Sequence, residues 1–407
     1  MDVAQIDYGQ LDKGENLRHL EELSGPLEQD ISKRKSGAGD WEKDWRDIPE
    51  LLWKWIPDPR PYGNGGEDDD ETLHLFLKEL IQSYVDLTDP RQYDIIASFV
   101  MATWLVEKFR AVPYLYAVGP YGSGKSTLQE VLNEVCYKAV KTSSITTAAL
   151  AGFIDKYHPT LLIDEAQIYN NKGRGELGAI VDAGYKRDNP RIKIVGKETR
   201  AYDLFGFKAF FSKEYPWESL ASRCLIVNMT QNQRELEETL TEEFERRGEV
   251  MRSFLAAYRS KKSGETISDK TTTSLNASIQ NGRVRELGRP LLFAAPVRVH
   301  EQILSFLKDL EEQHRSDTKT SDEAYYVQAL MLCKDEAQGM DGKVSTGYFR
   351  NALRLVMERD GLIVPSAKSV SQKLKGLGLR IMRASVGTFI LWDRGTIEGL
   401  AHRFSSS

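Results

Sequence analysis

A chain of 407 residues exceeds the usual size of one domain, which predicts two or three units, each able to bury its own core. Hydrophobic residues make up 41% of the chain and charged residues 28%, a balance typical of soluble globular proteins. The net charge of −5 excludes a general attraction to polyanions, so any contact with nucleic acid must come from local basic patches.

Neither a membrane span nor a secretory signal is evident near the amino end. The longest apolar run there, residues 99–106, is well short of the roughly 20 residues that a membrane-spanning helix needs. We therefore expect a cytoplasmic protein that does not associate with a membrane. Cys136, Cys224 and Cys333 lie far apart without CxxC spacing, which predicts buried thiols rather than a zinc site or disulfides.

Residues 1–70 carry two opposing signals. Their charge, Gly and Pro content favours a mobile lead-in, whereas four tryptophans favour a docking helix, because indole rings are costly to leave in water: Trp41, Trp45, Trp53 and Trp55. The sequence leaves both alternatives open. Apolar residues then recur at helical spacing, which predicts two helices in a lead-in at residues 71–112.

A phosphate-binding loop is the strongest motif in the chain. Residues 114–118 predict a buried strand, and a GxxxxGK[ST] sequence follows, with apolar residues on one helical face after it. Glycines let the backbone approach phosphates, while amide groups and the helix amino terminus face their negative charge. The alternative is an ordinary Gly-rich turn. The predicted contacts are Gly119, Pro120, Tyr121, Gly122, Ser123, Gly124, Lys125, Ser126 and Thr127.

A second motif supplies carboxylates. We expect Lys125 to reach the β- and γ-phosphates and Ser126 to bind magnesium. Residues 160–163 predict a short strand that ends in Asp164 and Glu165. At the carboxyl end of a parallel strand, Asp164 can hold the magnesium shell and Glu165 can polarise a water; the alternative is a charged strand end before a solvated loop. ATP and Mg2+ are the expected cofactors.

Together these motifs resemble those of AAA+ ATPases, and within them helicase-like proteins of plasmids and phages related to superfamily 3 and minichromosome-maintenance helicases. The resemblance covers roughly residues 75–300 and is strongest at residues 113–126, 162–166 and 220–223. It implies an α/β fold, with an AAA+ three-layer P-loop core at residues 113–230 and a helical lid and linker at 231–315. It also implies a homo-oligomeric ring, a hexamer by analogy with the family.

The same resemblance implies an arginine that acts on a neighbouring subunit. Leu220-Ala221-Ser222-Arg223 is similar to the family segment whose arginine reaches into the next subunit's ATP site, which makes Arg223 the candidate arginine finger. Cys224 stands where the family usually has Phe. The alternative is a structural arginine that pairs with a local carboxylate.

Two sensor positions follow from the resemblance as well. Arg285 resembles the sensor-2 arginine of the lid helix, with Arg283 and Arg289 as competing choices. Ser212 is the first polar residue after residues 207–211 and is the candidate for sensor 1, where the family more often has Asn or Thr.

A basic hairpin is predicted between residues 185 and 206. Polar and apolar residues alternate at 191–195, as in a half-exposed strand, and Gly196 and Gly206 could bound turns. The segment resembles the family hairpin that precedes sensor 1 and points into the ring's channel. Its cations would contact DNA phosphates without reading bases; the alternative is a solvated hairpin. They are Lys186, Arg187, Arg191, Lys193, Lys197 and Arg200.

Three later segments are predicted from their residue composition alone. Acidic residues come first and basic residues last in residues 234–259, which predicts a solvated helix. Residues 260–282 are polar and turn-rich and predict a loop or hinge, and a second polar break is predicted at residues 316–320.

The carboxyl-terminal segment, residues 321–407, resembles a small winged-helix domain. A helix is predicted at residues 366–377, started by Pro365 and Ser366, and two short strands follow at 379–383 and 388–392. Such a domain binds DNA or, alternatively, protein. The candidate DNA contacts are Lys368, Lys375, Arg380 and Arg383.

These features favour an ATP-dependent DNA translocase or helicase that acts in the replication of a mobile element, with single-stranded or forked DNA as its partner. A non-processive AAA+ switch, such as a replication initiator, loader or transposition regulator, is the alternative. A nucleotide-binding scaffold with a vestigial ATPase is a third class, against which the intact Lys125, Asp164 and Glu165 count.

Overall fold

The computed structural model describes residues 54, 57, 59–62, 69–142, 147–164, 174–195, 197–319 and 322–404. The chain divides into two compact units, Met1–Glu311 and Glu312–Ser407. All four tryptophans of the predicted docking helix, and Glu165, lie outside the described residues.

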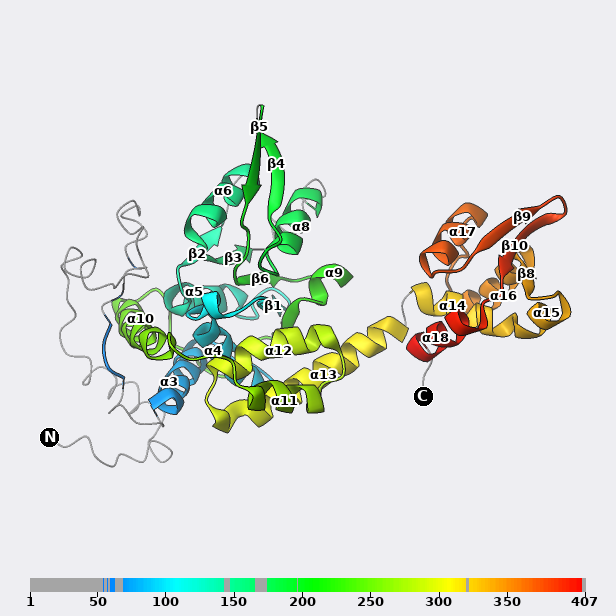
Figure 1. Cartoon of the computed structure of the whole chain (residues 1–407). Coiled ribbons are helices and arrows are strands. Elements are labelled where there is room, and N and C mark those ends of the chain that lie inside the picture. The colour runs from blue at the N-terminus through cyan, green and yellow to red at the C-terminus, as the bar shows by residue number, and fades with distance from the viewer. Residues whose placement is uncertain are drawn as a thin grey trace. The chain divides into compact units, whose positions relative to one another are not determined.

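A parallel sheet forms the centre of the first unit (Figure 1). Its strands are rich in branched and aromatic residues and are largely buried, as parallel sheets require, with Lys141, Asp164 and Asn228 exposed. The α/β class and the predicted strands at 114–118 and 160–163 are confirmed. In sheet order β2-β3-β6-β1-β7, the strands are β2 Ala139–Thr142, β3 Thr160–Asp164, β6 Lys208–Ser212, β1 Tyr114–Val118 and β7 Cys224–Asn228.

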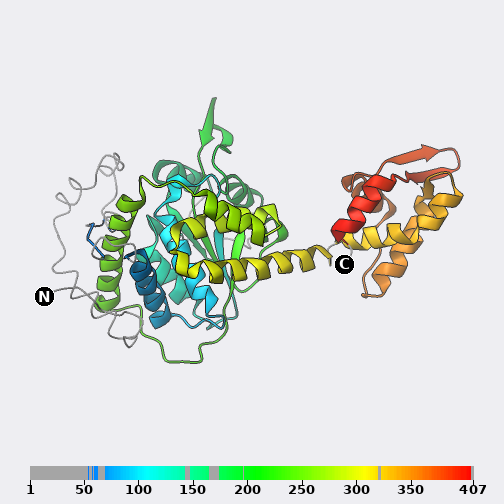
Figure 2. The same ribbon diagram turned by 60° about the horizontal axis from the view of Figure 1, so that its bottom comes forward.

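Helices surround this sheet, as the turned view shows (Figure 2). The two predicted lead-in helices are confirmed as α3 and α4, and the predicted helix after the Gly-rich loop is α5. The helices are α3 Asp69–Tyr84, α4 Arg91–Thr103, η3 Val106–Lys108, α5 Lys125–Val135, α6 Thr147–Tyr157, α8 Arg174–Ala183, α9 Glu218–Ala221, α10 Glu242–Lys262, α11 Asp269–Ser278, α12 Gly282–Ala294, η4 Val297–Val299 and α13 His300–Lys319.

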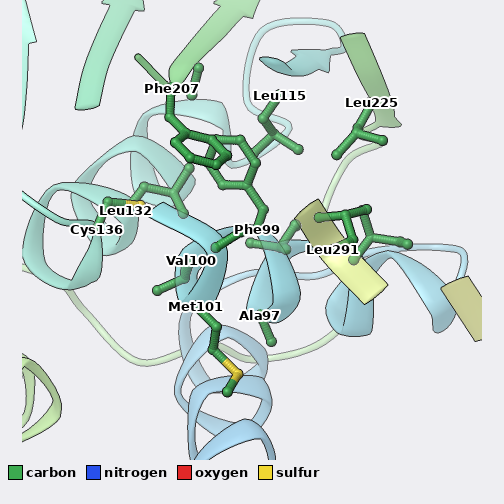
Figure 3. Close-up of a cluster of buried hydrophobic side chains, with 14 of the residues drawn as sticks. Ala97, Phe99, Val100, Met101, Leu115, Leu132, Cys136, Phe207, Leu225 and Leu291 are labelled. Carbon is green, nitrogen blue, oxygen red and sulfur yellow. The ribbon is translucent and has the colours of Figure 1, made fainter. Parts of the chain in front are cut away.

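Aromatic side chains join the helices to the amino-terminal edge of the sheet. Phe207 directly precedes β6, and its ring lies 5.3 Å from that of Phe99 on α4 (Figure 3). Phe109, shortly before β1, lies 5.8 Å from Phe293 on α12. Such edge-to-face pairs add to the stabilisation by burial, so α4 and α12 are held firmly against this edge.

Of three expectations about the later helices, the helix at residues 234–259 is confirmed only from residue 242, and the other two were wrong. Helix α10 begins at Glu242, eight residues later than predicted, where the Thr241 hydroxyl accepts a hydrogen bond from the Phe244 amide at 3.1 Å. It is also not simply solvated, because Phe244 and residues such as Phe254 are buried. Residues 269–278 form helix α11 rather than a loop, and α13 continues through residues 316–319. In α11 the Ser268 cap and buried Leu275 outweigh the polar composition.

A two-stranded antiparallel ribbon extends from the first unit (Figure 1). It comprises β4 Arg191–Val195 and β5 Glu198–Tyr202. The predicted hairpin is confirmed, and its second strand ends at Tyr202, four residues before Gly206.

The second unit has its own core and a small antiparallel sheet. Strand β10 pairs with both β8 and β9, and buried residues of α16 and α17, such as Phe349 and Leu374, pack with Ile390 of β10. The predicted helix at 366–377 and the strand pair after it are confirmed. The elements are α14 Asp322–Leu332, α15 Lys334–Gly339, β8 Lys343–Ser345, α16 Thr346–Glu358, α17 Ala367–Gly376, β9 Ile381–Ala384, β10 Gly387–Leu391 and α18 Arg394–Phe404.

Two further expectations concern apolar helices and thiols. Among the described residues, no helix has the length and apolar character needed to cross a bilayer. Cys136, Cys224 and Cys333 are buried free thiols, as predicted. Burial raises the pKa of all three, so they remain protonated at neutral pH.

His74 makes the stability of the first unit depend on pH. Its ring is 1% exposed between α3 and α4, and burial lowers its pKa to about 4, against the opposing influence of Asp94. The unfolded chain binds a proton at this residue below its ordinary pKa of 6.5, whereas the folded chain does not until about pH 4. Stability should therefore fall as pH drops through this window, by roughly 3 kcal/mol in total.

Urea unfolding of His74→Gln between pH 7.5 and 4.5 tests this expectation. The variant keeps a polar side chain for the Ser98 hydroxyl, which lies 3.3 Å from the His74 ring, but it cannot titrate, so its stability should vary less with pH than that of the wild type. His402→Gln, at an exposed position of the second unit, is the matched control. Parallel pH profiles for wild type and His74→Gln would contradict the assignment.

Candidate functional site

The loop between β1 and α5 has the geometry of an anion cradle. Gly124 has a φ of 80° and directly precedes Lys125, the first residue of α5, so a residue other than glycine would be strained there. The Lys125 ammonium donates to the carbonyls of Gly119 and Pro120, both at 2.7 Å, and to the Ser123 hydroxyl at 3.3 Å. A helix amino terminus and a loop-bound ammonium fit a phosphate group.

Asp164 lies at the same edge of the sheet as this loop. It is the exposed last residue of β3 and is level with Phe211 of β6, which is in turn level with Ala117 of β1. Because β6 alone separates β3 from β1, the ends of these strands lie roughly 10 Å apart. A carboxylate and the exposed Ser126 at this edge are hard oxygen donors that suit Mg2+.

The end of β6 presents Lys213 rather than Ser212 to the loop. Ser212 is fully buried; its hydroxyl accepts from the Glu214 amide at 3.0 Å and its carbonyl accepts from the Gly119 amide at 3.1 Å. Lys213 is exposed, and its ammonium lies 5.5 Å from the ring centre of Tyr121 in the loop. The sequence-predicted Ser212 hydroxyl is therefore committed to its own turn, while Lys213 contacts the loop.

Arg223 lies at the opposite edge of the sheet. Its carbonyl accepts from the Tyr114 amide at 2.9 Å, at the start of β1, whereas the loop follows the end of β1. Five residues of strand separate the two, a distance of roughly 15 Å. Its side chain, 16% exposed, pairs with Asp182 at 3.0 Å and donates to the Ser219 hydroxyl at 2.7 Å. Arg223 cannot reach the phosphate loop of its own chain.

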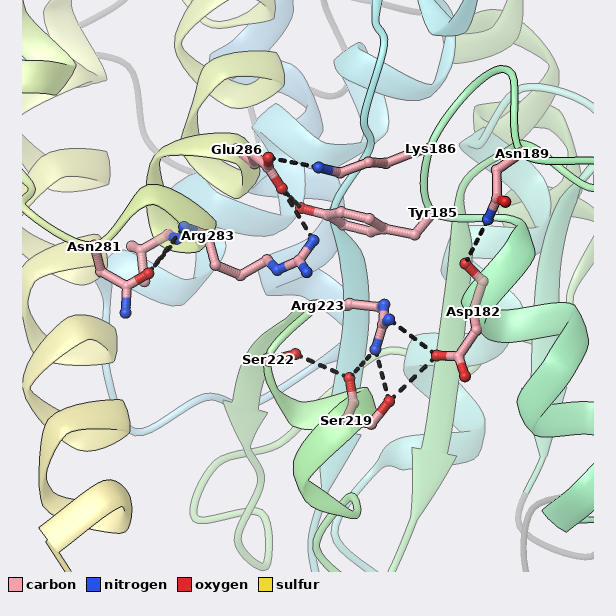
Figure 4. A network of polar contacts seen from close by, with 11 residues as sticks. Asp182, Tyr185, Lys186, Asn189, Ser219, Ser222, Arg223, Asn281, Arg283 and Glu286 are labelled. Atoms are coloured by element: carbon pink, nitrogen blue, oxygen red, sulfur yellow. Dashed lines mark hydrogen bonds and ion pairs between the residues drawn. The ribbon is translucent and has the colours of Figure 1, made fainter. Parts of the chain in front are cut away.

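The side chains of two arginines lie beside the ring of Tyr185 (Figure 4). The guanidinium carbon of Arg223 lies 5.7 Å from the ring centre and that of Arg283 lies 4.8 Å away. Glu286 accepts from Arg283 at 3.0 Å and from Lys186 at 2.7 Å. Burial opposes the charged form of Glu286, but the hydrogen bond from Lys186 leads the interactions that keep its pKa below the usual value.

The other two candidate arginines of α12 have different surroundings. Arg285, chosen from the sequence, donates to the Asn276 side chain of α11 at 3.4 Å. The Nε atom of Arg289 is buried without a hydrogen-bond partner. Among the three, Arg283 is the one that the structure brings beside Arg223.

The β4–β5 ribbon has two chemically distinct faces. Lys193 is directly opposite Arg200, and Arg191 is opposite Tyr202, so these four residues share one face. Ile192 and Ile194 lie on the other face and are 66% and 77% exposed. Lys197 lies in the exposed turn between the strands. The first face thus carries three cations, Glu198 opposite Val195, and the partly buried Tyr202, and the other face is largely apolar.

Two of the predicted hairpin cations lie at its base instead. The Lys186 ammonium is bound to Glu286, as described above. Arg187 donates to the carbonyls of Phe109 and Val106, both at 3.0 Å, and stacks on Phe205 at 4.5 Å. Their hydrogen bonds hold the ribbon's base to the body of the first unit.

In the second unit, helix α17 has one buried and one basic face. Val370 and Leu374 are buried, whereas Lys368 and Lys375, seven residues apart, are exposed on a common face. Arg380 and Arg383 are exposed before and within β9.

Sequence reasoning missed the part played by Tyr185 and Lys213. A tyrosine just before the basic segment carries no signal of its own, because its partners come from α12 and from the start of β7. Lys213 was detectable as a cation directly after a predicted strand, since strand ends in parallel sheets line the ligand-binding edge.

Comparison with known proteins returns structural neighbours only. No protein-family model and no curated protein matches the sequence. A full-length MCM homolog from Methanopyrus kandleri is 10% identical, over 63% of this chain and 63% of that chain, with a TM-score of 0.40. Two apo structures of the NrS-1 C-terminal region are 13% identical, over 83% of this chain and 78% or 77% of theirs, with TM-scores of 0.37 and 0.38. Likeness of this degree leaves the activity to be inferred from the site.

Proposed function

We propose that this protein is an ATP-dependent DNA translocase or helicase whose ATP sites are completed by neighbouring copies of the same chain. The observation that carries the proposal is the division of the site between the two edges of one sheet. The loop with Lys125 and the Asp164 carboxylate share the carboxyl-terminal edge, and Arg223 lies at the amino-terminal edge.

The carboxyl-terminal edge has the groups needed to hold Mg-ATP. Lys125 can exchange the loop carbonyls for phosphate oxygens, and Lys213 supplies a second cation beside Tyr121. Ser126 and Asp164 are the proposed magnesium ligands, with Glu165 next in sequence to orient the attacking water. The metal, when bound, would neutralise charge that develops on the phosphates.

The amino-terminal edge of the sheet, opposite the phosphate loop, carries cations. Arg223, just before β7, and Arg283 of α12 both contact the Tyr185 ring. In a head-to-tail ring each subunit presents one surface to the opposite surface of its neighbour. We infer that this pair serves the next subunit's phosphates, with Arg223 as the finger and Arg283, in place of Arg285, as the second arginine.

Two basic surfaces are the proposed DNA contacts. The cations of the ribbon's basic face can follow a phosphate backbone. The second unit has helix α17 and the β9–β10 strand pair in the order of a winged helix, with Lys368, Lys375, Arg380 and Arg383 exposed. If the second unit bound one specific duplex site, the protein would act as a replication initiator or loader instead.

Strand displacement on a forked DNA substrate tests the proposal. We expect an assembled form, ATP hydrolysis that single-stranded DNA accelerates, and displacement of the annealed strand. Site-specific duplex binding without displacement would favour the switch. A failure of the wild-type protein to hydrolyse ATP, with or without DNA, would refute the proposal.

Removal of the ribbon's basic face should weaken single-stranded DNA binding. Replacing Arg191, Lys193 and Arg200 with Ala is expected to lower affinity on the order of 10- to 100-fold and to reduce the slope of log affinity against log salt by about 2. The change follows from the loss of three phosphate contacts. Fluorescence anisotropy with an oligonucleotide at several salt concentrations measures both quantities.

The matched control changes the other face of the same ribbon. Ile192→Thr with Ile194→Thr keeps β-forming residues and every cation, so the salt slope should match that of the wild type. An equal loss of affinity and slope in both variants would show that the ribbon's basic face is not the contact.

A further inference from the structure

Lys208 is a fully buried cation at the base of the ribbon. It is the first residue of β6, and its ammonium donates to the carbonyls of Leu204 and Gly206, both at 3.1 Å. It also lies 5.1 Å from the ring centre of Tyr114. Within the described part of the chain it makes no ion pair. A buried charge without a counter-ion is costly, and an apolar residue would fill this position more cheaply.

Three segments of the first unit meet at this ammonium. The stretch with Leu204 and Gly206 is the return of the ribbon from β5 into β6. The Tyr114 hydroxyl of β1 donates to the Val181 carbonyl at 2.7 Å, at the end of α8. Gly184 comes just after α8, and its carbonyl accepts from the Gly206 amide at 3.2 Å.

Gly184 packs so closely against Lys208 and Leu204 that it must move with them. A Cβ atom at this residue would lie 2.3 Å from the Lys208 ammonium and 2.4 Å from the Leu204 carbonyl oxygen. There is no free space between the ribbon's return and this turn. A displacement of the ribbon's base is therefore passed directly to Gly184, because packed interiors do not absorb such shifts.

The residues beside Gly184 hold the paired arginines. Asp182 pairs with Arg223 at 3.0 Å, and the Tyr185 ring contacts both Arg223 and Arg283. We call Asp182, Tyr185, Arg223 and Arg283 the arginine platform. Gly184 lies two residues after Asp182 and one residue before Tyr185, so a shift at Gly184 moves both residues and changes where the arginines point.

We propose that Lys208 is a positioning residue that couples the DNA-contacting ribbon to the arginine platform. DNA that displaces the ribbon moves the Leu204 and Gly206 carbonyls, the ammonium follows them, and Gly184 carries the platform with it. This inference rests on the proposed function, and it adds a route by which DNA bound at the ribbon accelerates hydrolysis at the neighbouring site.

The protonation state of Lys208 should tune this coupling. Burial lowers its pKa to about 7, while Asp203 on the ribbon's return opposes the shift. The other titratable groups from the packed elements are Tyr114 of β1, Asp182 of α8, and Tyr185 just after α8. Charged hydrogen bonds to carbonyls are stronger than neutral ones, so the coupling should weaken as pH rises through about 7.

The test compares DNA stimulation of ATP hydrolysis in wild type and Lys208→Met. The variant should keep its DNA-free rate and its DNA affinity within about twofold, while the stimulation factor falls about fivefold or more. Stimulation of the wild type should decline between pH 6 and 8.5, and that of the variant should stay flat. Lys156→Met, an exposed lysine above the Tyr157 ring, is the matched control and should behave as wild type.

Two outcomes would overturn the role of Lys208. One is unchanged stimulation and an unchanged pH profile in Lys208→Met. The other is an equal loss of the DNA-free and DNA-stimulated rates, which would show a structural role only.

Amide hydrogen exchange decides the question independently of catalysis. If Lys208 couples the two regions, Lys208→Met should raise exchange together in residues 188–206 and 182–187. A rise confined to one region, or none, counts against the coupling. A wild-type protein that lacks ATPase activity would refute the proposed function. The hydrogen-exchange result would still decide separately whether Lys208 couples the two regions.

Discussion

Lys125→Ala should lower the rate of ATP hydrolysis roughly 100- to 1,000-fold, because it removes the ammonium aimed at the charge that develops on the phosphates. Gly124 should keep its left-handed conformation, but the variant also loses the hydrogen bonds from Lys125 to the Gly119 and Pro120 carbonyls, so thermal unfolding checks that the fold is kept. Steady-state phosphate release with and without DNA measures the loss. Lys213→Ala should have a smaller effect, about tenfold, because its cation lies at the rim of the loop.

Lys141→Ala is the matched control for these two variants. Lys141 is also a lysine beside α5, but it pairs with Glu130 on the surface, 2.6 Å away. Exposed ion pairs contribute little to stability, so this variant should hydrolyse ATP at the wild-type rate. Near-normal turnover by Lys125→Ala would place the nucleotide elsewhere and would remove the basis of the proposed function.

Arg223→Ala should lower hydrolysis on the order of 1,000-fold in the assembled protein while nucleotide binding stays close to wild type. The loop of each subunit remains intact in this variant, and only the cation offered to the neighbour is lost. Binding of a fluorescent nucleotide and hydrolysis should therefore respond very differently to the same substitution.

Mixing two inactive variants tests action between subunits directly. Where an Arg223→Ala subunit receives Arg223 from a Lys125→Ala neighbour, both required cations are present at one interface. Equal and random mixing should restore about a quarter of the interfaces, with activity to match. Mixtures that stay as inactive as the separate variants would refute the action of Arg223 on a neighbour.

Asp182→Ala separates this role from simple packing. It breaks the same ion pair as Arg223→Ala but leaves the guanidinium and its contact with the Tyr185 ring. Its loss of activity should be much smaller, about tenfold or less, because surface-accessible ion pairs are weak. Equal losses in the two variants would assign Arg223 a structural role.

Local patterns in the sequence predicted the elements around the Gly-rich loop. The strand at 114–118, the Gly-rich loop and the amphipathic helix after it are specified by neighbouring residues, and all three are present. Residues 260–282 show the limit of composition: Ser268 and Leu275 promote a helix there because one caps it and the other is buried against its neighbours. Burial between distant segments is not visible in a window of ten residues.

The sequence by itself determined the glycine-rich loop and the helix that follows it, because GxxxxGKS needs only its own backbone and the helix that it starts. Only the tertiary structure decided that Arg223 faces away from its own loop, that Arg283 rather than Arg285 joins it at Tyr185, and that Lys208 is buried. These facts depend on strand order and register, which bring together residues from separate parts of the chain. Interactions at that range are set by how the sheet assembles and leave no periodic signal along the sequence.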